Sequence, residues 1–213
     1  IMRNFNTKAI LLKKHKINDT DMVCSLLTKE FGKISVWGKE KQKENIDFFS
    51  VYESAIYRVK YKNKNVLNGL EVLIPNFKIR YDLAKFEDAF FVLDIINKLT
   101  IEETGNEFFD EAVDALKNIN DGNDAFVKEK FFLDALRLAG YEFVLDECVC
   151  CNVKLDTKIK SVFFSPKEGG IVCNICKKNK NIDAIKISEN DYEFLRRCVV
   201  GKNELKPELN KFI

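Results

Sequence analysis

Two pairs of cysteines in the last third of the chain have the spacing of a metal-binding site. Cys148 and Cys151 form the first Cys-x-x-Cys pair, and Cys173 and Cys176 form the second. Each such turn can present two sulfurs one ligand spacing apart, and four thiolates in a tetrahedron suit Zn²⁺. We therefore predict one zinc ion per chain, bound by these four residues. Four thiolates leave no open ligand position, so its role is structural.

The first pair allows more than one register, because Cys150 also lies in it. Cys148 and Cys151 match the spacing of the second pair. They also place Asn152 directly after the second sulfur, where such turns often need a positive φ that Asn tolerates. Cys150 is then spare, although it could replace either neighbour as a ligand. A redox pair and buried cysteines without a metal are the two alternatives to zinc.

Catalytic side chains are scarce elsewhere. The chain has one histidine, His15, in a lysine-rich segment, which disfavours a histidine-based triad or metal site. Residues 32–40 resemble a phosphate-binding loop only superficially, because the glycine spacing differs and Glu40 replaces the expected Ser or Thr. We predict a binding protein without a small-molecule substrate. An alternative interpretation is an enzyme that uses the Cys150 thiolate as its nucleophile.

The first third of the chain is basic. Residues 1–80 hold 16 Lys and Arg against 8 Asp and Glu, whereas residues 81–145 hold 6 against 15. Basic side chains follow phosphates, and aromatic faces stack on bases. The same basic segment also contains Lys64 and the aromatic residues Tyr52, Tyr57 and Tyr61. The predicted DNA-binding residues are Lys13, Lys14, Lys16, Lys29, Lys33, Trp37, Lys39, Lys41, Lys43, Arg58, Lys60 and Lys62.

The elements that position these residues follow from hydrophobic periodicity. Five segments have the composition of short strands, and Gly32 can adopt a positive φ in the turn before the third. Five strands in so short a stretch predict a small closed barrel, and the OB-fold is the commonest of these. The expected strands are 7–14, 22–28, 33–39, 51–60 and 66–74.

From residue 81 the apolar period changes from that of a strand to that of a helix. Helices are expected at 81–99, near 108–116, at 125–139 and at 188–199. The first is expected to be buried, because Leu83, Phe86, Phe90, Leu93 and Ile96 recur at helical spacing. Ser188 with Asp191 resembles a capping box at the start of the last helix. The fold class is therefore α+β: an OB-fold barrel at 1–80, then a helical domain at 81–213. That domain carries an inserted zinc-ribbon-like lobe at about 146–180.

The chain contains seven cysteines and no recognisable signal peptide, which fits a reducing compartment. No apolar run approaches the ~20 residues that span a bilayer. We expect a cytoplasmic protein that does not enter membranes.

The ordered set of motifs resembles the RecO family of bacterial DNA repair. The motifs are Thr-Lys-Ala-Ile-Leu-Leu at 7–12, Asp-Thr-Asp at 19–21, Leu-Leu-Thr-Lys-Glu-Phe-Gly-Lys-Ile at 26–34, Leu-Ala-Gly-Tyr at 138–141, Cys-x-x-Cys at 148–151, Phe-Ser at 164–165 and Gly-Gly-x-x-Cys-x-x-Cys at 169–176. The resemblance implies binding of single- and double-stranded DNA and annealing of complementary strands. It further implies that RecR and the acidic tail of single-stranded-DNA-binding protein are partners, and that RecA is loaded onto coated strands near the nucleoid.

That acidic tail needs a site that is both basic and apolar. Three of the six cations of the acidic middle segment lie on its third expected helix, so we predict that the tail binds Lys128, Lys130, Phe131 and Arg137. The alternative is that these are ordinary surface cations. The competing interpretation of the whole chain is an RNA-binding or transcription-associated factor, which also combines an OB-fold with a zinc ribbon.

Overall fold

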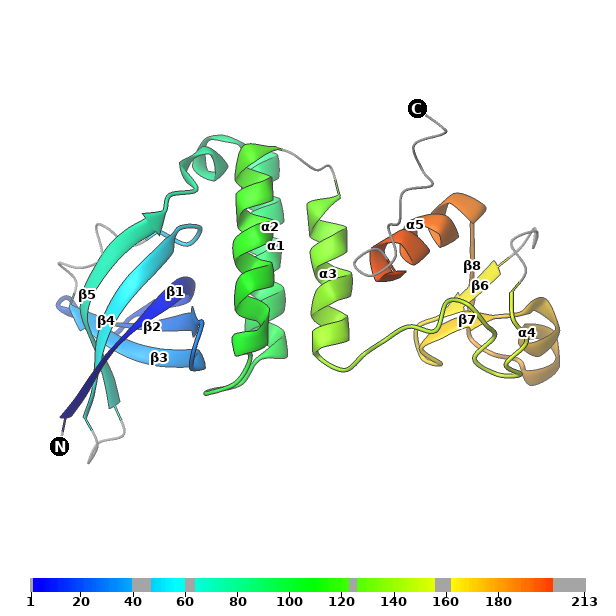
Figure 1. The fold of residues 1–213 in the computed structure, drawn as a ribbon, viewed down its shortest axis with the longest axis horizontal. Coiled ribbons are helices and arrows are strands. Elements are labelled where there is room, and N and C mark those ends of the chain that lie inside the picture. Colours follow the sequence, from blue (N-terminus) through cyan, green and yellow to red (C-terminus); the bar gives the residue numbers. More distant parts are fainter. Residues whose placement is uncertain (1, 40–46, 60–63, 123–125, 156–161, 201–213) are drawn as a thin grey trace. The chain divides into compact units, whose positions relative to one another are not determined.

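The computed structural model describes residues 2–39, 47–59, 64–122, 126–155 and 162–200, with the backbone alone for residues 2, 3, 55, 57–59 and 198–200. They form two compact units, which divide between Ala135 and Leu136. Figure 1 shows the helices and strands of each unit. The chain is a mixed α+β protein, as predicted.

The first unit contains a closed barrel of five strands in the order β1-β2-β3-β5-β4. Neighbouring strands are antiparallel except β3 and β5, which pair in parallel. β1 pairs first with β4 and then with β2, so this one long strand closes the barrel. The strands are β1 (Met2–Lys16), β2 (Asp21–Thr28), β3 (Gly32–Lys39), β4 (Val51–Val59) and β5 (Lys64–Ile74). Five strands are confirmed, although β1 begins earlier than predicted.

Alternate residues of each strand face inward, and the barrel interior is apolar because these inward residues are apolar. Val23, Ser25, Ser35 and Trp37 alternate with the inward residues of β2 and β3, and so lie on the outer face. The buried cluster consists of Ala9, Leu11, Met22, Cys24, Leu26, Ile34, Val36, Ile56 and Leu67.

A segment from outside the barrel is fastened to the edge of β3. The N–H of Lys33 donates to the carbonyl of Thr104, and the N–H of Glu103 donates to the carbonyl of Lys33, each over 2.7 Å. Gly32 makes this approach possible. It has a φ of 65°, as predicted, and a Cβ there would lie 2.2 Å from the Thr104 oxygen.

Three helices and two short 3₁₀ turns follow the barrel. Asp82 caps α1 by accepting hydrogen bonds from the backbone N–H of Ala84 and Lys85. The prediction that the first helix is buried along its length is wrong for Leu83, which is 74% exposed, and Phe90, which is 49% exposed. The elements are η3 (Phe77–Tyr81), α1 (Leu83–Leu99), η4 (Asn106–Phe108), α2 (Phe109–Asp121) and α3 (Val127–Leu138), which spans the division between the units.

The units therefore divide the chain at a different place from the predicted domain boundary at residue 80. The backbone N–H of Ser35 donates to the Glu102 carboxylate over 2.7 Å. This hydrogen bond ties the segment after α1 to the barrel, which is one reason why that segment belongs to the first unit. The predicted domain boundaries stay a prediction.

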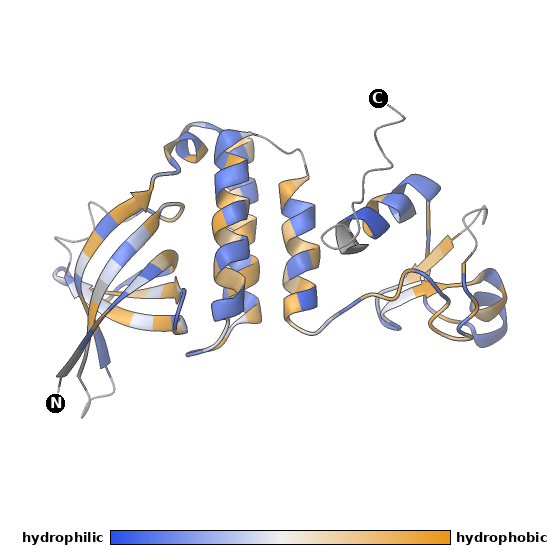
Figure 2. Ribbon diagram, viewed as in Figure 1, coloured by the Kyte–Doolittle hydropathy of each residue, from blue (hydrophilic) through white to orange (hydrophobic). Residues whose placement is uncertain are grey.

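The second unit is built on a small sheet in the order β7-β6-β8. Figure 2 shows β6 as largely hydrophobic and α4 as largely hydrophilic. Ser188 and Asp191 cap the last helix reciprocally, as predicted: each backbone N–H donates to the other's side chain over 3.1 Å. The elements are β6 (Val162–Ser165), β7 (Gly170–Val172), α4 (Asn174–Lys180), β8 (Ile185–Ile187) and α5 (Glu189–Val200). Among the described residues, no helix is both long and apolar enough to cross a bilayer.

Candidate metal centre and nucleic-acid interface

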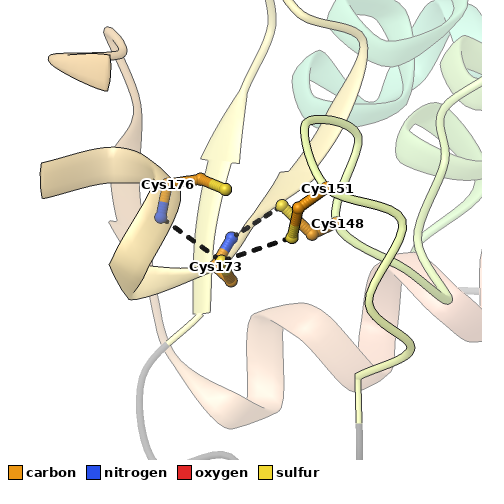
Figure 3. A group of neighbouring side chains, drawn as sticks. All are labelled: Cys148, Cys151, Cys173 and Cys176. Atoms are coloured by element: carbon orange, nitrogen blue, oxygen red, sulfur yellow. Dashed lines mark hydrogen bonds between the residues drawn. The ribbon is translucent and has the colours of Figure 1, made fainter. Parts of the chain in front are cut away.

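Four cysteine sulfurs converge in the second unit (Figure 3). Cys148 and Cys151 lie on the turn that precedes β6, Cys173 is the N-cap of α4, and Cys176 lies in its first turn. Their sulfur atoms all lie within 4.8 Å of one another, and those of Cys151 and Cys173 are 3.9 Å apart. Ligands of a tetrahedral zinc with Zn–S bonds of about 2.3 Å stand about 3.8 Å apart. The donor set and its spacing therefore fit a metal ion such as zinc.

Backbone N–H groups donate hydrogen bonds to two of these sulfurs. The N–H of Cys173 donates to the Cys148 sulfur over 3.3 Å, and the N–H of Cys176 donates to the Cys173 sulfur over 3.4 Å. Burial opposes ionisation of Cys148, but hydrogen bonds from the backbone of Cys173, Cys150 and Cys151 outweigh it and lower its pKa to about 6. Burial, and then hydrogen bonds with the neighbouring thiols, raise the pKa of Cys176. A bound cation would favour the thiolate at all four positions.

The local fold explains the register of the first pair. Asn152 has a φ of 58°, which confirms the expected positive φ after the second sulfur. The turn is held against β7, because the N–H of Val149 donates to the Ile171 carbonyl over 2.9 Å. Gly170 permits this packing, since a Cβ there would lie 2.8 Å from Cγ1 of Val149. The sulfur of Cys150 lies outside the converging group.

The remaining described cysteines do not belong to this site. Burial, and then repulsion by Cys148, raise the pKa of Cys150. Cys24 lies in the barrel interior, where burial raises its pKa to about 11. An exposed, activated thiolate of the kind that nucleophilic catalysis needs is thus seen at neither residue.

Strand register sorts the basic residues of the barrel onto different faces. Lys13 lies opposite Ser25, and Lys39 lies opposite Asp21, so both share the outer face with Trp37. Lys14 and Lys16 lie opposite Cys24 and Met22, and so share the face of those core residues at the end of the strand.

Several of these basic side chains already have partners. Lys33 donates to the carbonyls of Asn97 and Thr100 over 2.9 and 3.1 Å, at the end of α1. Lys29 pairs with Asp110, and Lys16 pairs with Asp19, each over 3.0 Å. Lys41, Lys43, Lys60 and Lys62 lie outside the described residues, as does the side chain of Arg58. The assignment of the set to DNA stays a prediction.

The contact between Lys64 and Trp37 on the outer face could not be predicted from the sequence. The amine of Lys64 lies 3.4 Å from the centroid of the Trp37 ring. The sequence alone indicates Lys64 only as one of many lysines in the basic first third. Its place beside Trp37 depends on the parallel pairing of β3 and β5, which strand periodicity does not reveal.

The residues predicted to bind a partner's tail are placed differently from one another. Lys128 pairs with Asp88 over 2.8 Å, and this hydrogen bond raises the lysine pKa. Phe131 is only 4% exposed. Lys130 lies on the same helix, whereas Arg137 lies beyond the division between the units and is exposed. The tail assignment also stays a prediction.

Comparison with known proteins covers nearly the whole chain. Residues 2–70 match the family described as Recombination protein O N terminal, and residues 80–208 match Recombination protein O C terminal. A DNA repair protein RecO of Dehalococcoides mccartyi is 27% identical over 95% of this chain and 85% of its own length. A DNA repair protein RecO of a Thermoanaerobacter species is 29% identical over 100% of this chain and 90% of its own length. A DNA repair protein RecO of Shouchella clausii is 33% identical over 79% of this chain and 67% of its own length.

Proposed function

Because this chain belongs to the RecO family, we propose that it is a recombination mediator of DNA repair. It binds single- and double-stranded DNA, anneals complementary strands and catalyses no covalent reaction. A protein with this role would act in the cytoplasm at the nucleoid. The relatives' shared name, DNA repair protein RecO, supports the general role.

The observation that carries the proposal is the outer face of the barrel. Lys64 lies over Trp37 there, Lys39 follows Trp37 by two residues on β3, and Lys13 lies on the outer face of β1. We assign the closed five-stranded barrel to the OB-fold. The lysines would neutralise phosphates and release counterions, and the indole would stack on a base. Neutralisation lowers the repulsion between two phosphate backbones, which is what annealing requires.

The partners proposed are RecR and the acidic tail of single-stranded-DNA-binding protein, with RecA as the protein loaded onto the coated strand. The residues assigned to the tail all belong to α3 and are Lys128, Lys130, Phe131 and Arg137. Charge complementarity to an acidic tail supports this part of the proposal.

We assign Zn²⁺ to Cys148, Cys151, Cys173 and Cys176, in a lobe of the zinc-ribbon type. Four thiolates close its coordination shell, so the ion would supply folding free energy to the second unit and no chemistry to a substrate. The cysteines themselves would hold the turn before β6 against the start of α4.

An annealing assay tests the proposal. Two complementary oligonucleotides are mixed with the protein at two salt concentrations, with and without coating protein. We expect faster annealing in both cases, and an affinity for single strands whose logarithm falls with log salt by about 0.7 per phosphate contact. The Lys13→Ala and Lys39→Ala double variant should lose annealing rate, while Lys98→Ala, which removes an exposed charge from α1, should not. Tighter binding of structured RNA than of DNA would instead support the RNA-binding alternative.

A further inference from the structure

The amine of Lys64 lies over the only tryptophan of the chain. It stands 3.4 Å from the centroid of the Trp37 ring. The register of the barrel explains the contact. Trp37 on β3 pairs with Val66 on β5, and Lys64 precedes Val66 by two residues, so it projects from the same face. The lysine therefore covers a ring that the barrel already holds outward.

The Lys64 amine is held by this contact alone among the described residues. No carboxylate in that part of the chain lies within ion-pair distance of it, unlike the amines of Lys16, Lys29 and Lys128. The ring itself is partly exposed. A cation over an exposed ring contributes only about two- to fivefold to an equilibrium. The ring face is thus occupied by a group that is easily displaced.

We propose that Trp37 is the platform for one unpaired nucleobase, and that Lys64 covers the platform in the DNA-free protein and yields it to the base. The inference rests on the proposed DNA binding and names the part of the nucleic acid that this face takes. Base stacking on an aromatic side chain contributes about 5- to 150-fold in affinity, which exceeds the cation contact that it replaces. The released ammonium then pairs with a phosphate, so its charge is used in both states.

The exchange discriminates between single strands and duplexes. In a duplex the bases are paired and stacked on one another, so none can reach the ring without unpairing. Duplex DNA is then held by phosphate contacts alone, whereas a single strand adds the stacked base. This face of the barrel takes unpaired bases, whatever their identity, because every base has a π-face.

The intrinsic fluorescence of Trp37 tests the platform directly. The whole protein is titrated with an oligothymidylate, with an abasic oligomer of the same phosphate number, and with a duplex. We expect the oligothymidylate to quench the tryptophan strongly, and the other two to bind with little quenching. Failure of all three to bind would sink the DNA-binding function itself. Binding of all three with equal quenching would overturn the platform alone.

Substitutions test the exchange. Trp37→Leu should bind the oligothymidylate at least fivefold more weakly and the abasic oligomer equally well, and Trp37→Phe should recover part of the loss. Lys64→Ala and its matched control Lys13→Ala each remove one positive charge. At high salt, Lys64→Ala should bind the oligothymidylate about two- to fivefold more tightly than Lys13→Ala, because its ring is already uncovered. The proposal is contradicted if Lys64→Ala and Lys13→Ala bind the oligothymidylate with equal affinity at high salt. It is also contradicted if Trp37→Leu loses the same affinity for the oligothymidylate and for the abasic oligomer.

Discussion

The backbone N–H of Cys173 donates a hydrogen bond to the sulfur of Cys148, over 3.3 Å. This bond joins the two halves of the proposed metal centre. Cys173 also starts α4, whose first turn carries Cys176, so the helix and the centre share one residue. Formation of the centre and of α4 should therefore be coupled.

Replacing a converging cysteine should remove the metal and unfold the lobe around it. We expect Cys148→Ser or Cys173→Ser to reduce bound zinc toward zero, measured by atomic absorption, and to lose the amide dispersion of the second unit in NMR spectra. The reason is that metal binding supplies on the order of 10 kcal/mol to folding of such small sites. Cys150→Ser is the matched control and should retain zinc, because its sulfur lies outside the group. Full zinc content in both ligand variants would refute the assignment.

Gly32 should tolerate no side chain. Its φ is 65°, and a Cβ would lie 2.2 Å from the Thr104 oxygen, so Gly32→Ala must displace the segment from β3. We expect a loss of unfolding free energy of about 2–4 kcal/mol, measured by urea denaturation. Gly122→Ala separates the two causes: its φ is 74°, but its nearest neighbour would be 3.5 Å away, so it should lose only about 1 kcal/mol. Equal losses in the two variants would mean that the close approach contributes nothing.

Local patterns predicted the elements but not their surroundings. The capping of the last helix by Ser188 and Asp191 and the positive φ of Gly32 and Asn152 depend on neighbouring residues, and the structure confirms them. The short elements β7, α4 and β8 went unpredicted, because three to seven residues carry too little periodicity.

What the sequence could not reveal depends on long-range pairing. Leu83 and Phe90 have helical spacing, but whether the face they form is covered depends on tertiary packing. Lys64 meets Trp37 only because β3 and β5 pair in parallel. In contrast, the four cysteines were predictable because their spacing reflects the short-range geometry of each Cys-x-x-Cys turn.

Lys33 should prove to be a stabilising residue of the first unit. Its amine donates to the carbonyls of Asn97 and Thr100, and burial lowers its pKa from the ordinary value. Lys33→Met removes both hydrogen bonds and should cost about 1–3 kcal/mol of unfolding free energy, measured by urea denaturation. Lys13→Met, which alters an exposed lysine of the same barrel, should change it by less than about 0.5 kcal/mol. If Lys33→Met leaves stability intact but weakens DNA binding, the original assignment of Lys33 to DNA is the better one.

Arg137 provides the test of tail binding. It is exposed near the end of α3, where a cation also suits the helix dipole, so its replacement tests binding with little effect on the core. In a calorimetric titration with the acidic tail peptide, Arg137→Glu should bind roughly tenfold more weakly, since reversal turns one attraction into a repulsion. Lys117→Glu makes the same charge change at another exposed cation, on α2, and should bind within about twofold of the unmodified protein because it lies outside the assigned site. A weakening of equal size in both variants would show that only net charge matters, and unchanged binding by Arg137→Glu would remove this residue from the site.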